Sequence, residues 1–157
     1  MFFLHGLDSS SRGTKARYFA ANFPRVACPD FSGDLKERLK QLKEICSDSN
    51  NLTLIGSSFG GLMATCFALE RPHKVARLIL LAPALNYGNY CPPKITLTLP
   101  VTLIIGRHDT ITPADKVIPL AEKTFSNLEV QLADDDHMLH NSFPQLDWSD
   151  YIREQQR

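Results

Sequence analysis

Residues 52–61 read LTLIGSSFGG, an apolar run that stops at a cluster of glycines and serines. Within it, residues 56–60 fit the pattern G-x-S-x-G, and a segment of helical character follows. Where a buried strand leads into a helix, this pattern makes a sharp turn that holds the serine hydroxyl out at the carboxyl edge of the sheet. The stretch supports the hypothesis that Ser58 is a nucleophile; the alternative is a glycine-rich turn that serves only packing.

Two phosphate-binding motifs can be compared with the same residues. A P-loop requires G-x-x-x-x-G-K-[ST], and no lysine follows Gly60 or Gly61. A dinucleotide-binding fingerprint requires G-x-G-x-x-G, and Ser58 stands where its second glycine would be. The sequence therefore fits neither motif.

The sequence around this stretch predicts an α/β fold with helices on both faces of a parallel sheet. Short apolar runs alternate with longer segments of helical period, which is typical of that architecture. The expected strands are residues 2–4, 25–28, 52–55, 76–81, 101–105 and 128–132. The expected helices are residues 12–23, a segment within 33–48, 60–70, 112–125 and 145–157. In the fourth helix we expect Thr112 as the N-cap and a kink or split at Pro119.

Length and composition are those of one globular domain, residues 1–157. Lys plus Arg equals Asp plus Glu at 17 each, which gives no indication of binding to nucleic acid or a membrane surface. The apolar start MFFL is shorter than the roughly 7–15 apolar residues of a signal peptide. No segment reaches the roughly 18 apolar residues of a membrane span. We therefore expect a cytoplasmic protein, and the residues do not indicate its oligomeric state.

The four cysteines form no C-x-x-C pair, and no Cys/His cluster has the spacing of metal ligands. We expect buried apolar thiols rather than a disulfide framework, because the chain is long enough to build a core without cross-links. No metal site is expected.

A serine hydroxyl near neutral pH needs a base, and the base needs an orienting group. His137 lies just beyond the last expected strand, where a loop can supply a base to a site at the sheet edge. Asp109 ends the segment VTLIIGRHD, again after an apolar strand, and a carboxylate there can fix the imidazole tautomer. Taken alone, His137 could be a surface histidine and Asp109 a turn or capping residue. His140 is a weaker candidate for the base.

Catalysis of this kind also needs backbone N–H groups aimed at the negative charge that develops on the substrate oxygen. The segment FFLHGLDSSS supplies a strand followed by His5-Gly6 and a polar loop. The N–H groups of Leu7 and Phe59 are the natural donors.

The order of these motifs along the chain resembles the enzymes of the α/β-hydrolase fold, whose triad runs serine, acid, histidine. The opening LHGLDSSSRGTKA looks like the L-H-G-x-x-S-S start of small bacterial esterases in that superfamily. The resemblance covers nearly the whole chain. It implies these roles: Ser58 as nucleophile, His137 as general base and acid, Asp109 as its orienting carboxylate, and Leu7 and Phe59 as oxyanion donors.

The resemblance also implies a minimal α/β-hydrolase fold with a mostly parallel, six-stranded sheet, in which residues 25–28 form the edge strand beside residues 2–4. Larger relatives insert a lid domain at the position of residues 83–100, a segment too short for one. We therefore expect no lid domain and an open site, with Leu85, Tyr87 and Tyr90 as wall residues. An open site suits small or extended acyl groups and predicts a preference for short chains.

These observations lead to a serine hydrolase that cleaves small carboxylic esters through an acyl-enzyme. The implied partner is a small-molecule ester, and no cofactor is implied. Three alternatives stay open: a thioesterase or other acyl hydrolase on the same triad, a cofactor-free lyase or haloperoxidase-like activity, and a non-catalytic binding module with the same fold.

Overall fold

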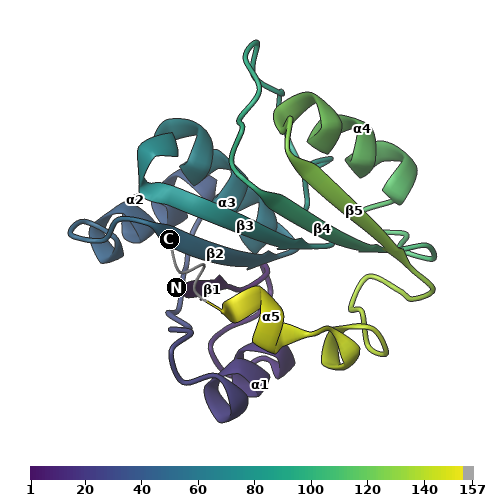
Figure 1. The fold of residues 1–157 in the computed structure, drawn as a ribbon, viewed down its shortest axis with the longest axis horizontal. Helices are drawn as coiled ribbons and strands as arrows, with labels where there is room; N and C mark the ends of the chain where they lie inside the picture. Colours follow the sequence, from purple (N-terminus) through teal and green to yellow (C-terminus); the bar gives the residue numbers. More distant parts are fainter. Residues whose placement is uncertain (154–157) are drawn as a thin grey trace.

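The computed structural model describes residues 1–153. One sheet of five strands has the order β1-β2-β3-β4-β5, and each strand pairs in parallel with the next one along the chain (Figure 1). The strands are β1 (Phe2–Leu4), β2 (Leu52–Ser57), β3 (Val75–Leu81), β4 (Val101–Gly106) and β5 (Leu128–Ala133). Five of the six expected strands are confirmed. The apolar run of β4 is buried along its whole length, as expected for a strand covered by helices on both faces, whereas the edge strand β5 is only partly buried.

The sixth expected strand, residues 25–28, is reduced to a single parallel bridge between Phe2 and Ala27. Ala27 accepts a hydrogen bond from the Phe3 N–H and donates one to the Met1 carbonyl. The neighbouring strand β1 is only three residues long, and Pro24 and Pro29 flank the segment without an N–H to donate. The ladder therefore has no room to extend, and the sheet has five strands rather than six.

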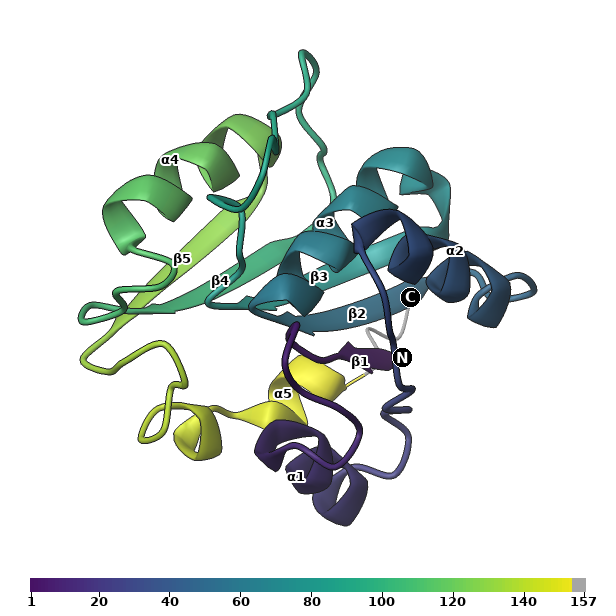
Figure 2. The same ribbon diagram turned by 180° about the vertical axis from the view of Figure 1, so that it is seen from behind.

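Helices cover the two faces of the sheet in separate groups (Figures 1 and 2). One face carries α2 (Leu35–Ile45), α3 (Phe59–Glu70) and α4 (Ala114–Thr124), and the other carries α1 (Thr14–Asn22) and α5 (Trp148–Ile152). Two short 3-10 helices connect other elements: η1 (Pro72–Lys74) lies between α3 and β3, and η2 (Phe143–Gln145) lies between β5 and α5. The last expected helix, residues 145–157, is shorter than predicted within the described residues, and residues 154–157 lie outside them.

Each face of the sheet buries its own hydrophobic cluster. The larger cluster lies under α2, α3 and α4 and includes Leu42, Phe67 and Leu103. The smaller cluster joins α1 and the C-terminal segment through Phe19, which packs edge-on against Trp148 with ring centroids 4.8 Å apart. Helix α1 and the segment 143–152 are thereby packed against each other on one face.

The start of α4 differs from the sequence prediction. Pro113, not Thr112, is the N-cap residue, and no side chain caps the helix. The helix is not split at Pro119 but continues through it to Thr124. Thr112 lies just before the helix with its side chain buried in the site described below.

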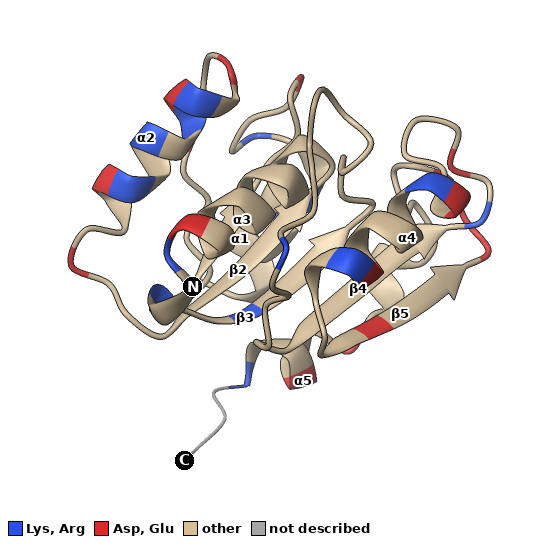
Figure 3. Cartoon of the chain, turned by 90° about the horizontal axis from the view of Figure 1, so that it is seen from above, with Lys and Arg blue, Asp and Glu red and all other residues tan. Residues whose placement is uncertain are grey.

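Charged residues lie mainly on the outer surfaces of the helices and in the loops, and both signs alternate along α2 and α4 (Figure 3). The segment 83–100 runs from β3 past the end of α4, where Leu97 bridges Phe125, and it forms no lid domain. No helix within residues 1–153 combines the length and the hydropathy needed to cross a membrane. The four cysteines are free; Cys46 is buried, but Cys91 is exposed, contrary to the expectation of buried thiols.

Candidate active site

Ser58 occupies a strained turn between β2 and α3. Its backbone has φ 54° and ψ −116°, a combination that L-residues rarely adopt and that costs of the order of 1–3 kcal/mol. The turn requires glycine on both sides of the serine. A Cβ at Gly56 would collide with the Gly60 carbonyl, and one at Gly60 would collide with the Leu4 carbonyl at the end of β1. The sequence therefore holds the Ser58 side chain at the carboxyl edge of the sheet at the cost of local strain.

The Ser58 hydroxyl begins a chain of hydrogen bonds that runs through His137 to Asp109. Ser58 Oγ lies 3.1 Å from His137 Nε2, and His137 Nδ1 lies 2.8 Å from Asp109 Oδ2. Because a carboxylate only accepts, the proton of the neutral ring is on Nδ1, and Nε2 is left to accept from the serine. The structure thus brings together three residues that are far apart in the sequence.

The Asp109 carboxylate is buried, and each of its oxygens has two hydrogen-bond donors. Oδ1 accepts from the Ile111 and Thr112 backbone N–H groups, both at 2.8 Å. Oδ2 accepts from the Thr112 hydroxyl at 2.6 Å as well as from His137. Four donors replace the hydrogen bonds to water that the carboxylate loses on burial. Asp109 can therefore hold the imidazole in one orientation.

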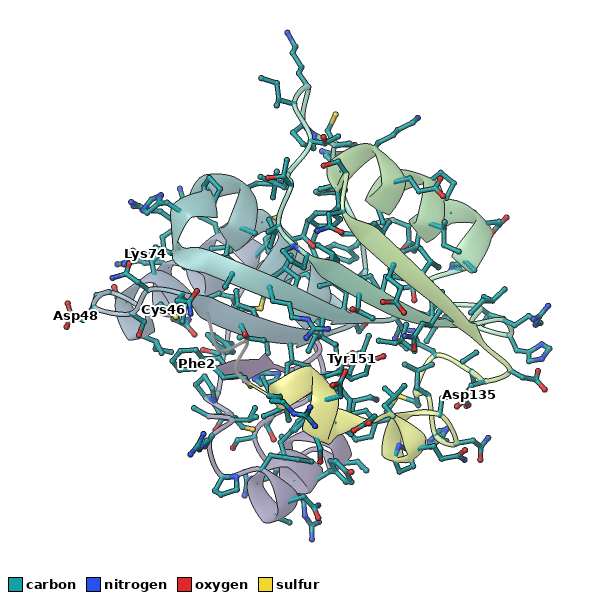
Figure 4. All side chains as sticks on the ribbon, viewed as in Figure 1. Phe2, Cys46, Asp48, Lys74, Asp135 and Tyr151 are labelled. Carbon is teal, nitrogen blue, oxygen red and sulfur yellow. The ribbon has the colours of Figure 1, made fainter. Side chains whose placement is uncertain are left out.

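Asp135 closes the loop that carries His137 (Figure 4). Its Oδ2 accepts from the Asn141 N–H, the Ser142 N–H and the Ser142 hydroxyl, at 2.7 to 2.9 Å. Burial opposes ionisation, but the hydrogen bonds from Ser142, Asp136 and Asn141 outweigh it and lower the pKa of Asp135 to about 2. The carboxylate fastens the two ends of the loop that presents His137.

Lys15 supports the same loop from α1. Its Nζ donates to the Met138 carbonyl at 2.6 Å and lies 5.5 Å from the centroid of the Phe143 ring. Burial lowers the pKa of Lys15, while the negative charges of Asp136 and Asp135 act in the opposite direction. The residue after His137 is thus tied to the helix layer below the sheet.

The loop after β1 is fixed by two buried side chains. His5 Nε2 accepts from the Phe31 N–H at 2.9 Å, so its proton is on Nδ1, which donates to the Gly6 carbonyl at 2.7 Å. Arg38 donates to the carbonyls of Gly6 and Leu7 at 3.4 and 3.0 Å, and also to Gly33 at 3.0 Å. Both residues therefore restrain the Gly6–Leu7 peptide.

The orientation of that peptide bears on the proposed oxyanion donors. In a trans peptide the C=O and N–H bonds point in opposite directions, so the donors to the Gly6 carbonyl turn the Leu7 N–H away from Arg38. A Cβ built on Gly6 would lie 3.6 Å from Ser58 Cβ, which places this peptide beside the serine. Within residues 1–153, no hydrogen bond is donated by the Leu7 or Phe59 N–H. Both donors are free for a ligand.

The other candidate residues from the sequence lie elsewhere. His140 is exposed and bonds to Asp136, so it does not reach Ser58. Leu85 is buried in the core, and the Tyr90 hydroxyl bonds to Thr124 at 2.6 Å, where burial raises its pKa to about 12. Of the three expected wall residues, Tyr87 lines a groove beside the site.

Four supporting residues were missed by the sequence analysis: Lys15, Arg38, Thr112 and Asp135. The sequence predicts Thr112 only as a helix cap. No periodicity or motif marks Lys15 or Arg38, since each acts through backbone carbonyls far away in the sequence.

A groove of about 500 Å³ borders the residues with the proposed oxyanion donors. Its exposed lining is mainly apolar. It comprises the apolar residues Leu7, Leu35, Leu39, Phe59 and Tyr87 and the charged residues Asp34, Lys36, Lys43 and Glu70. Within residues 1–153, no group of three or more His, Cys, Asp or Glu side chains is arranged to hold a metal ion.

Comparison with known proteins gives partial matches in sequence and nearly complete matches in structure. The sequence profile of the family Hydrolase_4, described as serine aminopeptidase, S33, matches residues 24–97. The biotin biosynthesis bifunctional protein BioHC of Teredinibacter turnerae is 49% identical over 49 residues. That match covers 31% of this chain and 8% of the relative, so the chain spans a small part of that protein's length.

Solved structures match along almost the whole chain. A protein of the alpha/beta hydrolase superfamily from Xanthomonas campestris pv. campestris has a TM-score of 0.76 and 26% identity, over 92% of this chain and 91% of that one. Alpha/beta hydrolase domain-containing protein 10 from mouse has a TM-score of 0.75 and 20% identity, over 97% and 90%. Monoacylglycerol lipase from Paleococcus ferrophilus has a TM-score of 0.69 and 16% identity, over 96% and 89%.

The parallel sheet, the serine turn and these matches define the class of protein. The chain has the fold of the α/β-hydrolase superfamily, and residues 1–153 contain no lid domain.

Proposed function

We propose that the protein is a serine hydrolase that cleaves small carboxylic esters through an acyl-enzyme intermediate. The observation that carries the proposal is the continuous hydrogen-bond chain from Ser58 through His137 to Asp109, which begins at a serine held in a strained turn. A binding module has no need for such strain next to a base and a buried carboxylate.

In the first half of the reaction, Ser58 Oγ attacks the ester carbonyl carbon while His137 Nε2 takes the hydroxyl proton. Asp109 stabilises the imidazolium that forms, because its Oδ2 already accepts from Nδ1 at 2.8 Å. The negative oxygen of the tetrahedral intermediate accepts from the free N–H groups of Leu7 and Phe59. His137 then donates the proton to the alkoxide as the C–O bond breaks, and the alcohol leaves.

In the second half, water attacks the acyl carbon and passes a proton to His137 Nε2. A second tetrahedral intermediate forms, and its negative oxygen again accepts from the N–H groups of Leu7 and Phe59. When it collapses, His137 returns the proton to Ser58 Oγ and the acid is released. The reaction is hydrolytic throughout, and these steps need no redox partner or cofactor. Thioesters would be cleaved by the same steps, with a thiol as the leaving group.

Labelling with a fluorophosphonate probe tests the nucleophile. The probe reacts with a serine only when a neighbouring base and oxyanion donors activate it, so we expect stoichiometric labelling of the native chain and none of Ser58→Ala. A matched control is Ser57→Ala, since Ser57 is the adjacent serine and should leave labelling unchanged. Equal labelling of the native chain and Ser58→Ala would show that the nucleophile is a different residue.

A further inference from the structure

The groove beside Ser58 lies on the side of the sheet opposite to the base. Its lining residues Leu39 and Phe59 belong to the cluster under α2 and α3, whereas Leu139, two residues after His137, belongs to the cluster with α1 and α5. Lys15 of α1 also holds the His137 loop through the Met138 carbonyl. Ser58 therefore has the groove on one side and the imidazole on the other.

This arrangement determines on which side of Ser58 the alcohol and the acyl chain of an ester substrate lie. His137 must donate its proton to the leaving alcohol, so the alcohol lies on the side of the imidazole. The oxygen of the intermediate lies between Leu7 and Phe59, and both residues line the near end of the groove. The remaining substituent on the carbon, the acyl chain, is thereby directed into the groove.

The lining of the groove matches an apolar chain. Leu35, Leu39 and Lys43 follow one another at intervals of four residues, so they form one stripe along α2. Phe59 forms the opposite side and packs edge-on against Tyr87, with ring centroids 5.4 Å apart. Leu7 and Tyr87 are large apolar side chains that remain 41% and 53% exposed at the rim. Exposed apolar side chains around a hollow are typical of a ligand site.

An ion pair limits the length of the groove. Lys43 Nζ contacts Glu70 Oε2 at the end far from Ser58, where α2 and α3 face each other. Leu35 and Lys43 are eight residues apart on the helix, which corresponds to about 12 Å. An extended alkyl chain advances roughly 1.25 Å per carbon, so about eight to ten carbons fill this length. The last carbon of such an acyl chain would lie beside the Lys43–Glu70 ion pair.

We propose that this groove is the acyl-binding site and that the substrates are esters of medium-length, unbranched fatty acids. The proposal rests on the proposed function and modifies the expectation of short chains, because the sequence predicted an open site but not the groove. A second hollow, of about 610 Å³, lies at the opposite edge of the sheet near Asn51, His73 and Pro100 and contains none of the catalytic candidates.

The test is the dependence of kcat/KM on chain length for p-nitrophenyl esters from acetate to palmitate. We expect kcat/KM to rise from acetate by up to about fourfold per methylene as each one is buried, to peak near octanoate or decanoate, and to fall at palmitate. Leu35→Trp fills the groove without touching the triad. It should lower kcat/KM for octanoate by about tenfold or more, the effect of two lost methylenes, and leave acetate nearly unchanged.

Two further variants control this result. Lys40→Trp places the same bulk on an exposed position of α2 outside the groove, and the profile should stay as in the native chain. Lys43→Ala removes the charged end and should move the maximum toward dodecanoate; it also carries the test should Leu35→Trp fail to fold. A native profile that falls steadily from acetate, or equal losses on acetate and octanoate in Leu35→Trp, would overturn the groove assignment. Absence of both labelling and hydrolysis in the native chain would instead reject the proposed function.

Discussion

At the scale of single residues, Arg38 is the least expected part of the site. It is 4% exposed and donates to three backbone carbonyls, and its guanidinium stacks 5.2 Å from the centroid of the Phe59 ring. Burial lowers its pKa, while the charge of Asp8 acts in the opposite direction. Arg38 thus connects the two segments that carry the proposed oxyanion donors.

Arg38→Met should lower kcat by about 10- to 100-fold, somewhat less than the loss of an oxyanion donor itself, because the Leu7 N–H would no longer be held in place. KM should change little, and the affinity for a boronic acid that mimics the tetrahedral intermediate should fall in parallel with kcat. Arg38→Lys should restore part of the activity, since an ammonium can reach one carbonyl.

The matched control for Arg38 is Arg77→Met. Arg77 also stacks on an aromatic ring, 5.4 Å from the centroid of Tyr151, but it lies on β3 near α5. This variant should lose stability without a selective loss of kcat. A parallel fall of kcat in both variants would mean that Arg38 acts only through stability.

At the scale of elements, the sequence predicted what depends on local pattern. Apolar runs predicted β2 to β5, and the leucine spacing predicted α2. Both predictions were possible because burial of one face or of both faces sets the spacing of apolar residues along the sequence. The prediction of a strand at residues 25–28 was wrong. Pairing at that position depends on the length of β1, which the residues 25–28 themselves do not reveal. Arg38 and Lys15 could not be predicted, because their partners are backbone carbonyls that only the tertiary structure brings near.

The end of α2 offers a test at this scale. Lys74 Nζ donates to the carbonyls of Cys46, Ser47 and Ser49, at 3.3, 2.6 and 3.2 Å, in the turn that follows the C-terminal end of α2 (Figure 4). Lys74→Met should lower the free energy of unfolding by about 1–2 kcal/mol, the usual effect of losing bonds to a charged donor at a partly exposed site. Urea denaturation measures the change.

Lys94→Met is the control for that experiment, because Lys94 is an exposed lysine in the segment 83–100. It should unfold at the same urea concentration as the native chain. A similar loss of unfolding free energy in both variants would mean that the loss of a surface charge causes the effect, rather than the loss of the hydrogen bonds at the end of α2.

At the scale of the whole molecule, stability should depend on pH through Asp135. Its pKa is about 2 in the folded protein and close to 4 in an unfolded chain. A pKa depressed by folding contributes stability above pH 4, and that contribution is lost as the pH falls from about 4 to 2. Thermal unfolding between pH 7 and pH 2.5 should show this loss, and Asp135→Asn should be less stable at pH 7 and converge on the native curve in acid.

Asp134→Asn separates this effect from general acid denaturation. Asp134 is the adjacent aspartate, with a side chain that is 85% exposed and paired with His108. Its pH curve should follow that of the native protein. An identical pH dependence for Asp135→Asn and the native chain would contradict the assignment.

The connection of the His137 loop to the α1–α5 layer couples the site to local unfolding. Ser58 is fixed by the sheet and α3, but His137 is held by Asp135, Lys15 and the cluster around Leu139. An opening of that layer alone would withdraw the base and leave the sheet, the serine turn and the acyl groove intact. We therefore expect turnover to depend on how firmly α1 and the segment 143–152 are docked on the sheet, and the free energy of that local opening is smaller than the free energy of unfolding the whole protein.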